Sequence, residues 1–443
     1  MISLKSATSM SNQHKKSKYN FANTGWLLIE KVLQLFLGLG VAIYVARYLG
    51  PEDYGVLSYS QSLVMMFSAI AALGIDNVIV RELTQDRDNV HRIIPSAIIM
   101  KLSGGALSAC LSTVTAWIIA PSPDMAVLVA IISVSMMFNS SIVVNLFFQS
   151  IEKIKFSAIA NSFAFTFSAL TKVTFILINA PLSWFAFALL LDSIYIAIAL
   201  LIVFLRFKPQ MAVKYTFDYS FAKRVFLESW PLIFSMLAVM VYSRIDQLML
   251  MQMIGKEAVG HYSVAVKLYD AAIVLPTAII VSFFPRVVNA MKETDIATAF
   301  NRYFQIPIIL AISIAIFVTL TSFWFIPLLF GEQYQASSSV LNILIWGAIF
   351  TVLGMIRSRW VTMKKLQKYT IVYVVIGMSI NILLNLILIP KYGITGAAWA
   401  SFAAQVCSGY IGVLLMRKTR PFFRIASNLL NPFRWNFHRG IHG

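Results

Sequence analysis

The feature of this sequence that most limits its fold is a series of apolar stretches, each long enough to cross a lipid bilayer. A helix of about 20 apolar residues spans a hydrocarbon layer roughly 30 Å thick, because each residue advances the helix by about 1.5 Å. Hydrophobic residues make up 59% of the 443 positions, whereas soluble domains contain roughly 45–50%. The sequence therefore predicts an integral membrane protein.

The number and spacing of these stretches predict about twelve transmembrane helices. Alternating strand patterns of about ten residues, which a membrane barrel needs, are absent, and unpaired backbone groups cannot face lipid. An all-α bundle is therefore the expected fold class. The predicted spans are residues 25–48, 55–73, 93–119, 125–148, 156–178, 182–205, 225–254, 258–281, 304–329, 340–360, 370–389 and 394–415.

The distribution of positive charge predicts the orientation of these helices. The formal net charge is +18, which by itself would also suit a nucleic-acid-binding protein. If the N-terminus is cytoplasmic, however, the segments facing the cytoplasm hold 28 of the 36 lysines and arginines, and the opposite ends hold three. Cytoplasmic loops are enriched in these residues. We therefore expect both termini to be cytoplasmic, and no nucleic-acid partner.

The longest polar interruption divides the chain into two halves of six predicted helices. An internal similarity supports the division, because Gly50 and Gly55 in the first half recur as Gly255 and Gly260 in the second, at a constant offset of 205 residues. A tight reversal between spans favours glycine. An even number of helices per half predicts a parallel repeat, with its pseudo-two-fold axis along the membrane normal. The expected domains are residues 1–24 (cytoplasmic segment), 25–205 (first bundle), 206–224 (linker), 225–416 (second bundle) and 417–443 (basic cytoplasmic tail).

Several classes of function lack their sequence signatures. Residues 1–20 are polar and basic, so no cleaved signal peptide is expected, and Cys110 and Cys407 fall within predicted helices, which argues against a disulfide or metal site. The GxxxxGK[ST], HExxH and GxSxG motifs are absent. Asp86-Arg87-Asp88 has the spacing of a metal-binding acid pair, but a solvated charged loop is the favoured interpretation. We therefore expect neither catalytic residues nor a cofactor.

Ionisable residues inside the spans are the main candidates for function, because each costs at least about 2.5–3.5 kcal/mol near the bilayer centre. Lys101 and Lys172 lie near helix ends, where we expect them to snorkel to the interface. Lys267 lies near the midplane, and an ion pair with Asp270 at i+3 is as plausible as a functional role. The full set is Glu30, Lys31, Lys101, Lys172, Asp192, Arg244, Asp246, Lys267 and Asp270.

Other polar and helix-disrupting residues in the spans have two possible roles each. Arg244 and Asp246 cannot share one helix face, so we expect polar surroundings on more than one side. Asp192 has no sequence partner, which leaves a proton or ion site and a hydrogen bond between helices equally open. Pro231 and Pro276 are expected to interrupt their helices and are candidate hinges. Helix-to-helix hydrogen bonds are the favoured role of Asn145, Gln149, Asn161, Asn381 and Asn385.

Four stretches, two in each half of the chain, resemble a known family. Residues 44–55, YVARYLGPEDYG, are followed by a helix ending at residues 74–82, GIDNVIVRE, and the second half contributes YSRIDQLML at 242–250 and VGHYSVA at 259–265. These stretches resemble bacterial polysaccharide-unit flippases of the O-antigen type. That family belongs to the multidrug, oligosaccharidyl-lipid and polysaccharide exporter superfamily, and the resemblance covers most of the chain. It implies two six-helix bundles arranged as a V around a central cavity.

The resemblance also implies a cargo and a mechanism. The cargo would be an oligosaccharide unit on undecaprenyl pyrophosphate, flipped from the cytoplasmic to the periplasmic face of the bacterial inner membrane by alternating access. Coupling to a proton or sodium gradient would drive the transport. The pyrophosphate or glycan acids would be bound by Lys31, Arg47, Arg244 and Lys267. The expected ion-coupling carboxylates are Glu30, Asp192, Asp246 and Asp270.

The further partners that the resemblance implies are membrane lipids and the polymerase and chain-length proteins of the same pathway. Two other functions stay open at this point. A drug or metabolite cation antiporter of the same superfamily would have the same fold. A membrane-embedded glycan polymerase is less favoured, because the outer loops are short.

Overall fold

The structure is a computed structural model that describes the backbone of residues 2–207 and 215–431. Side chains are described for residues 30–207, 215–367 and 369–431. Residues 432–443 of the predicted basic tail lie outside these ranges, as do the side chains of the predicted N-terminal segment. The described residues form helices and no strand.

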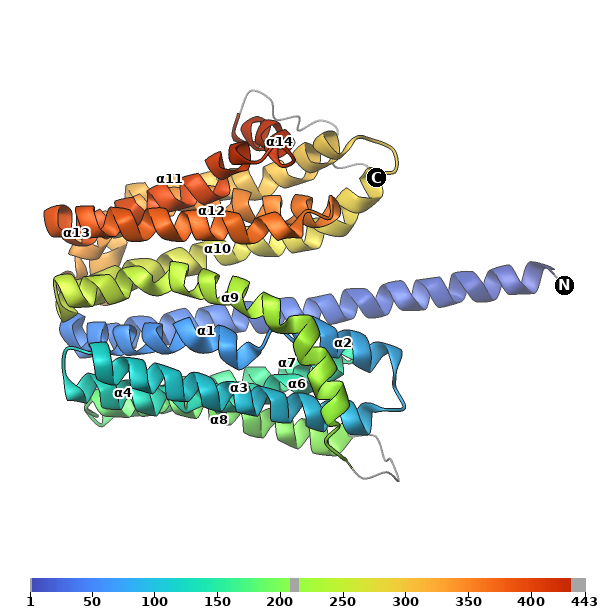
Figure 1. Ribbon diagram of the computed structural model, residues 1–443, viewed down its shortest axis with the longest axis horizontal. Helices are drawn as coiled ribbons and strands as arrows, with labels where there is room; N and C mark the ends of the chain where they lie inside the picture. Colours follow the sequence, from blue (N-terminus) through green and yellow to red (C-terminus); the bar gives the residue numbers. More distant parts are fainter. Residues whose placement is uncertain (1, 208–214, 432–443) are drawn as a thin grey trace. The chain divides into compact units, whose positions relative to one another are not determined.

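The helices follow the apolar stretches, and Figure 1 labels most of them. Their bounds are α1 (Ile2–Ala72), α2 (Asp76–Gln85), α3 (Val90–Ile119), α4 (Pro123–Ser133), α5 (Ser135–Phe138), η1 (Asn139–Ser141), α6 (Ile142–Ser150), α7 (Ile154–Leu177), α8 (Leu182–Phe207), α9 (Tyr219–Met253), α10 (Lys256–Ala290), α11 (Ile296–Phe330), η2 (Glu332–Tyr334), α12 (Ala336–Met363), η3 (Gln367–Tyr369), α13 (Thr370–Gly409), η4 (Ile411–Leu415) and α14 (Arg420–Leu430).

The described part of the chain contains 10 segments long and apolar enough to cross a membrane. Two of them continue through a glycine with non-helical backbone angles, Gly50 in α1 and Gly393 in α13. Each of these glycines lies between two predicted spans, so α1 and α13 each contain two of the predicted twelve. The all-α membrane fold with about twelve spans is therefore confirmed.

The contacts divide the chain into two compact units. Unit 1 comprises Met1–Val45 and Phe67–Met236, and unit 2 comprises Ala46–Met66 and Leu237–Gly443. The limits of the units fall inside α1 and α9. They reflect how the helices pack together and do not mark the ends of domains along the sequence. The domain boundaries drawn from the sequence therefore stay a prediction.

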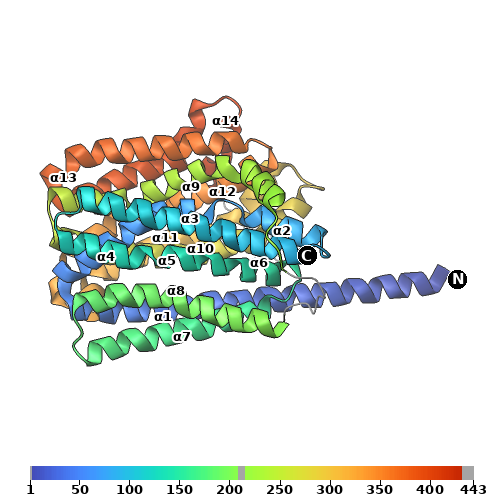
Figure 2. The same ribbon diagram turned by 60° about the horizontal axis from the view of Figure 1, so that its bottom comes forward.

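Within unit 1, α3 packs on α4 and α7 packs on α8 (Figures 1 and 2). One buried apolar cluster joins α2 and α3 to α6 and to the start of α9, and Ile79, Phe148 and Val225 are fully buried in it. The short helix α2 follows the second predicted span and turns its apolar face, including Ile79 and Leu83, into this cluster. The polar face of α2 stays exposed.

Within unit 2, α12 packs against α10, α11 and α13. The apolar cluster at one end of this unit also includes α14, whose Phe422, Ile425 and Leu429 are buried. This helix lies in the segment predicted from the sequence as a basic cytoplasmic tail, where no helix was expected. Its short apolar repeat, with residues three and four apart, is the signal that would have indicated an amphipathic helix.

The span predicted at residues 125–148 is confirmed as a membrane-crossing segment at Pro123–Ser150, but its backbone is divided into α4, α5, η1 and α6. The break lies where α3 comes close, because a Cβ on Gly105 would collide with the carbonyl of Met136. Helices α9 and α10 continue on both sides of Pro231 and Pro276, since a spanning helix tolerates proline where neighbouring groups satisfy the freed carbonyl. A hinge at either proline stays a prediction.

Candidate functional site

The most enclosed carboxylate in unit 2 is Asp246 of α9, which is 5% exposed. Its Oδ1 accepts a hydrogen bond from Asn385 Nδ2 at 2.6 Å, and its Oδ2 accepts one from Tyr262 OH at 2.6 Å. Ser401 Oγ also donates to Oδ2. Two helices, α10 and α13, thus place neutral donors around one acid of α9.

The α13 side of this site is built by helical periodicity. Asn381 and Asn385 lie four residues apart, so both project from one face. Asn385 Nδ2 also lies 3.2 Å from Asn381 Oδ1, and Asn381 Nδ2 donates to Ser401 Oγ at 3.2 Å. The helix-to-helix role expected of both asparagines is therefore confirmed.

The charge of this site is unbalanced within the described part of the chain. Asp246 forms no ion pair with a described residue there, and Asn385 Oδ1 is buried with no hydrogen-bond partner among these residues. A carboxylate without a cation is costly in an apolar interior. A proton or a small hard cation on these oxygens would remove that cost.

Unit 1 contains a second enclosed acid, Glu30 of α1, which is 7% exposed. Asn161 Nδ2 of α7 donates to Glu30 Oε1 at 2.9 Å and lies 3.5 Å from Asn145 Oδ1 of α6. Asn161 Oδ1 is buried and unpartnered among the described residues. Each unit therefore holds one buried acid beside an asparagine with a spare amide oxygen.

The two other predicted coupling acids have a cationic partner. Lys172 Nζ of α7 lies 2.6 Å from Asp192 Oδ2 of α8, and Ser168 Oγ donates to Asp192 Oδ1 at 2.5 Å. Asp270 of α10 pairs with Arg244 Nη2 of α9 at 3.1 Å. The pairing of Asp270 with Arg244 was not among the expectations drawn from the sequence.

The expectation that Lys101 and Lys172 snorkel to the interface was wrong. Lys101 is fully buried, and its Nζ lies 2.6 Å from Asp76 Oδ1 and 3.3 Å from the carbonyl of Ala72. Lys172 reaches Asp192 instead. Both lysines have a carboxylate within reach on a neighbouring helix, and depth along a single helix could not reveal that partner.

The predicted cationic residues lie in different places. Lys31 is exposed and donates to Gln34 Oε1 at 3.2 Å, Arg47 is exposed close to Gly50, and Lys267 is exposed on α10. Arg244 has a side chain that is only 17% exposed, and its Nε is buried without a partner among the described residues. While Nη2 of Arg244 is paired with Asp270, its Nε therefore makes no hydrogen bond to another described residue.

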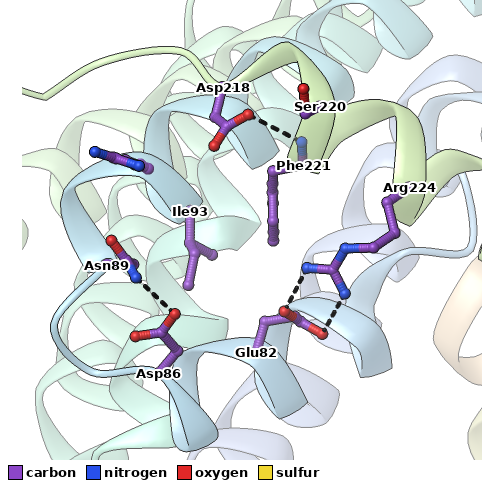
Figure 3. Close-up of a pocket in the computed structure, with 9 residues that line it drawn as sticks. Glu82, Asp86, Asn89, Ile93, Asp218, Ser220, Phe221 and Arg224 are labelled. Carbon is purple, nitrogen blue, oxygen red and sulfur yellow. Dashed lines mark hydrogen bonds and ion pairs between the residues drawn. The ribbon is translucent and has the colours of Figure 1, made fainter.

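A pocket of about 350 Å³ opens at the end of unit 1, between α2, the start of α3 and the start of α9 (Figure 3). Arg224 forms a two-pronged bond with Glu82, at 3.2 and 2.8 Å. Asn89 donates to Asp86, and Asp218 accepts from the backbone of Phe221. The contact between Arg224 and Glu82 joins the start of α9 to α2, and the other two contacts are local to their own segments.

The charged loop beside this pocket agrees with the solvated interpretation of Asp86-Arg87-Asp88. Arg87 and Asp88 are exposed, and Asp86 is engaged with Asn89. The structure contains no group of three or more His, Cys, Asp or Glu side chains arranged for a metal within its described residues.

Sequence reasoning did not single out Arg357, a buried cation in α12. Its guanidinium lies over the ring of Tyr373 at 4.2 Å, and it donates to the carbonyl of Ser408. Arg357 lies close to the end of a predicted span, where arginine is common at the cytoplasmic interface. Its burial depends on the later contact with α13.

The fold and these buried polar groups define a multi-pass helical membrane protein with the fold of a known class of transporter. The chain is similar to a structure of the lipid II flippase MurJ in an inward closed conformation, with a TM-score of 0.71 and 16% identity, over 91% of this chain and 90% of that one. It is also similar to an inward-facing multidrug resistance MATE family transporter, with a TM-score of 0.67 and 15% identity, over 89% of this chain and 95% of that one.

Residues 21–291 match the model of the polysaccharide biosynthesis protein family, and the chain belongs to that family. Residues 231–387 also match the MatE model. A putative O-antigen transporter of Shigella flexneri is 24% identical over 85% of this chain and 92% of its own length. A probable flippase, AglR, of Haloferax volcanii is 23% identical over 87% of this chain and 81% of its own length. The family resemblance seen in the sequence is thus confirmed.

Proposed function

We propose that this protein flips a lipid-linked oligosaccharide unit across the bacterial inner membrane, with both termini in the cytoplasm. The observation that supports this function best is the polysaccharide biosynthesis family match over residues 21–291, together with relatives named as O-antigen transporter and flippase. The cargo would be an oligosaccharide on undecaprenyl pyrophosphate. Its lipid tail would stay in the bilayer while the anionic head group passes between the helices.

Cationic side chains would bind the pyrophosphate or acidic sugars. Lys31, Arg47, Arg244 and Lys267 are the residues that we propose for this role. Arg244 is the strongest of them, because its buried unpartnered Nε can donate to a phosphate oxygen. A second anion near Arg244 would compete with Asp270 for the guanidinium, so cargo binding would loosen that ion pair.

Asp246 and Glu30 are the favoured coupling carboxylates. Both are buried, both accept hydrogen bonds from neutral groups, and both lie beside an unpartnered amide oxygen. Asp192 and Asp270, the other two candidates, already have a cation, so a further ion would have to displace Lys172 or Arg244. We propose that a proton or sodium ion binds at Asp246 or Glu30 and favours one conformation of its unit.

The test uses a bacterial strain that lacks its own flippase and expresses this chain. Asp246→Asn and Arg244→Ala should each reduce glycan export at least tenfold while the protein stays folded in the membrane. Asp88→Asn, which changes an exposed loop acid, is the matched control and should export normally. Full export by both Asp246→Asn and Arg244→Ala would refute the proposed site.

A cation antiporter is the second candidate function, favoured by the MatE match over residues 231–387 and by the MATE structural neighbours. The same strain distinguishes the two. Lowered sensitivity to cationic drugs on expression of this chain, with no restored glycan export, would support the antiporter. Restored glycan export with unchanged drug sensitivity would support the flippase.

A further inference from the structure

The segment that follows α13 exposes basic side chains that have no carboxylate partner in the described part of the chain. Residues 411–431 contain Arg417, Lys418, Arg420 and Arg424 and no aspartate or glutamate. All four basic residues are exposed, and none of them forms an ion pair with another described residue. Other exposed arginines of the protein, such as Arg81 and Arg224, do have carboxylate partners.

The backbone that carries these cations is anchored to unit 2. Thr419 is fully buried and accepts a hydrogen bond from Tyr373 OH at 2.6 Å. Arg420 Nε donates to the carbonyl of Leu414 at 2.8 Å. The ring of Tyr410 stacks on Phe423 at 4.8 Å, and Tyr410 OH lies 2.9 Å from Ser427 Oγ. Because this backbone is already ordered, binding an anion to its basic side chains costs less conformational entropy than binding to a flexible segment.

Helix α14 itself cannot insert its apolar face into a membrane, as free amphipathic helices do. Phe422, Ile425 and Leu429 are already buried against unit 2, and α14 packs on α11 and η4. Figures 1 and 2 show α14 at the margin of the unit 2 helices. The basic side of α14 therefore faces away from the core of unit 2.

Exposed apolar side chains lie directly before the cations. Ile411 is 45% exposed and Leu415 is 65% exposed, in the η4 turn that follows the last predicted span. Apolar groups beside fixed cations at the end of a spanning helix match the boundary between acyl chains and head groups. A soluble acidic protein would account for the cations but not for the exposed Ile411 and Leu415.

We propose that η4 and the start of α14 form a binding site for anionic phospholipid, with Arg417, Lys418, Arg420 and Arg424 at the phosphates and Ile411 and Leu415 at the acyl chains. This site is independent of the cargo and of ion coupling. It would fix unit 2 in the leaflet that contains the anionic head groups.

The experiment measures lipid binding by native mass spectrometry on the full chain in detergent. The ligands are phosphatidylglycerol, phosphatidylcholine of the same chain length, and inorganic phosphate. The test variant combines Arg417→Gln, Lys418→Gln and Arg424→Gln, and leaves Arg420 intact because Arg420 has an internal hydrogen bond. The matched control combines Arg87→Gln, Arg92→Gln and Lys153→Gln, which removes three exposed cations from unit 1.

We expect the test variant to bind phosphatidylglycerol at least roughly tenfold more weakly than the wild type, since each cation contributes to head-group attraction. The control should stay within about twofold of the wild type, and a variant with Arg417→Lys and Arg424→Lys should bind normally. Equal losses in the test and control variants would overturn the proposal. So would equal binding of phosphatidylcholine, or full competition by inorganic phosphate. Unchanged thermal unfolding of the test variant checks that it is folded.

Discussion

Gly55 and Gly260 make reciprocal contacts within unit 2. A Cβ on Gly55 would collide with the carbonyl of Lys256, and a Cβ on Gly260 would collide with the carbonyl of Pro51. The offset between Pro51 and Lys256 equals that between Gly55 and Gly260, 205 residues, so each half of the internal repeat makes the same contact with the other. Such reciprocity is the mark of a two-fold relationship.

Alanine at either glycine should destabilise the protein. We expect Gly55→Ala and Gly260→Ala each to cost about 1–3 kcal/mol, because the added methyl group meets backbone and not a flexible side chain. Gly40→Ala is the control, since nothing lies within 4 Å of its added Cβ and alanine favours a helix. Thermal unfolding in detergent checks this, and equal midpoints for all three variants would contradict it.

The buried ion pair between Lys101 and Asp76 should respond unequally to its two deletions. Asp76→Asn leaves the fully buried Lys101 without its carboxylate and should cost about 3–5 kcal/mol. Lys101→Met leaves Asp76, whose side chain is 40% exposed and can be hydrated, so it should cost less. The midpoints of thermal unfolding of both variants and of the double variant give the comparison. A larger loss for Lys101→Met would show that the pairing is misassigned.

The exposed network between α2 and α9 should contribute little to stability despite its good geometry. Arg81 pairs with Glu228 at 2.7 Å, and Arg224 pairs with Glu82 at 2.8 Å. Exposed ion pairs typically contribute less than about 1 kcal/mol. A double-mutant cycle with Arg224→Ala and Glu82→Ala should give a coupling energy in that range that decreases in high salt. A coupling that is large and insensitive to salt would mean that the pair is shielded from water.

Asp295 should make stability depend on pH at low pH. It caps α11 by accepting hydrogen bonds from the backbone of Ala297 at 2.9 Å and from the side chain of Thr298 at 2.5 Å. The hydrogen bonds from Thr298 and Ala297 lower the pKa of Asp295 from its ordinary value of 3.8. The stabilisation is therefore complete above that value and is lost as the pH falls through the lower, folded-state pKa.

An Asp295→Ala variant tests this cap. Loss of an N-cap typically costs about 1 kcal/mol, so the variant should unfold at a lower temperature at pH 7. The difference from the wild type should shrink as the pH falls below 3.8. An Asp295→Asn variant, which keeps a capping oxygen without the charge, should show a smaller difference at pH 7 and little change with pH.

Much of the fold followed from the sequence because hydropathy acts locally. The apolar stretches located the spans, and Asn161 and Asn385 were recognised as helix-to-helix contacts. The role of glycine was only partly understood. Gly50 and Gly255 have the positive φ of tight reversals, at 73° and 124°, whereas Gly55 and Gly260 are required by close approach between helices. That distinction depends on a contact between distant segments.

Contacts between distant segments also limited how far the candidate sites could be predicted from the sequence. Lys172 and Asp192 were both noticed, but their pairing requires knowing that α7 and α8 turn these faces toward each other. Arg357 was missed because arginine at the end of a span looks like an ordinary interfacial residue. Side chains whose environment is set by a partner far along the chain could not be assigned from one sequence.

The buried pairs also differ in when their members are made during synthesis. Lys172 precedes Asp192 by only 20 residues, so both enter the translocon within one helical hairpin and can neutralise each other there. The hydrogen bond from Asn385 to Asp246 can form only after a further 139 residues have been synthesised. A nascent chain that ends before α13 therefore has Tyr262 beside Asp246 but lacks the two donors from α13, Asn385 and Ser401. It is the stage of biogenesis at which we expect membrane chaperones and quality-control proteases to act on this protein.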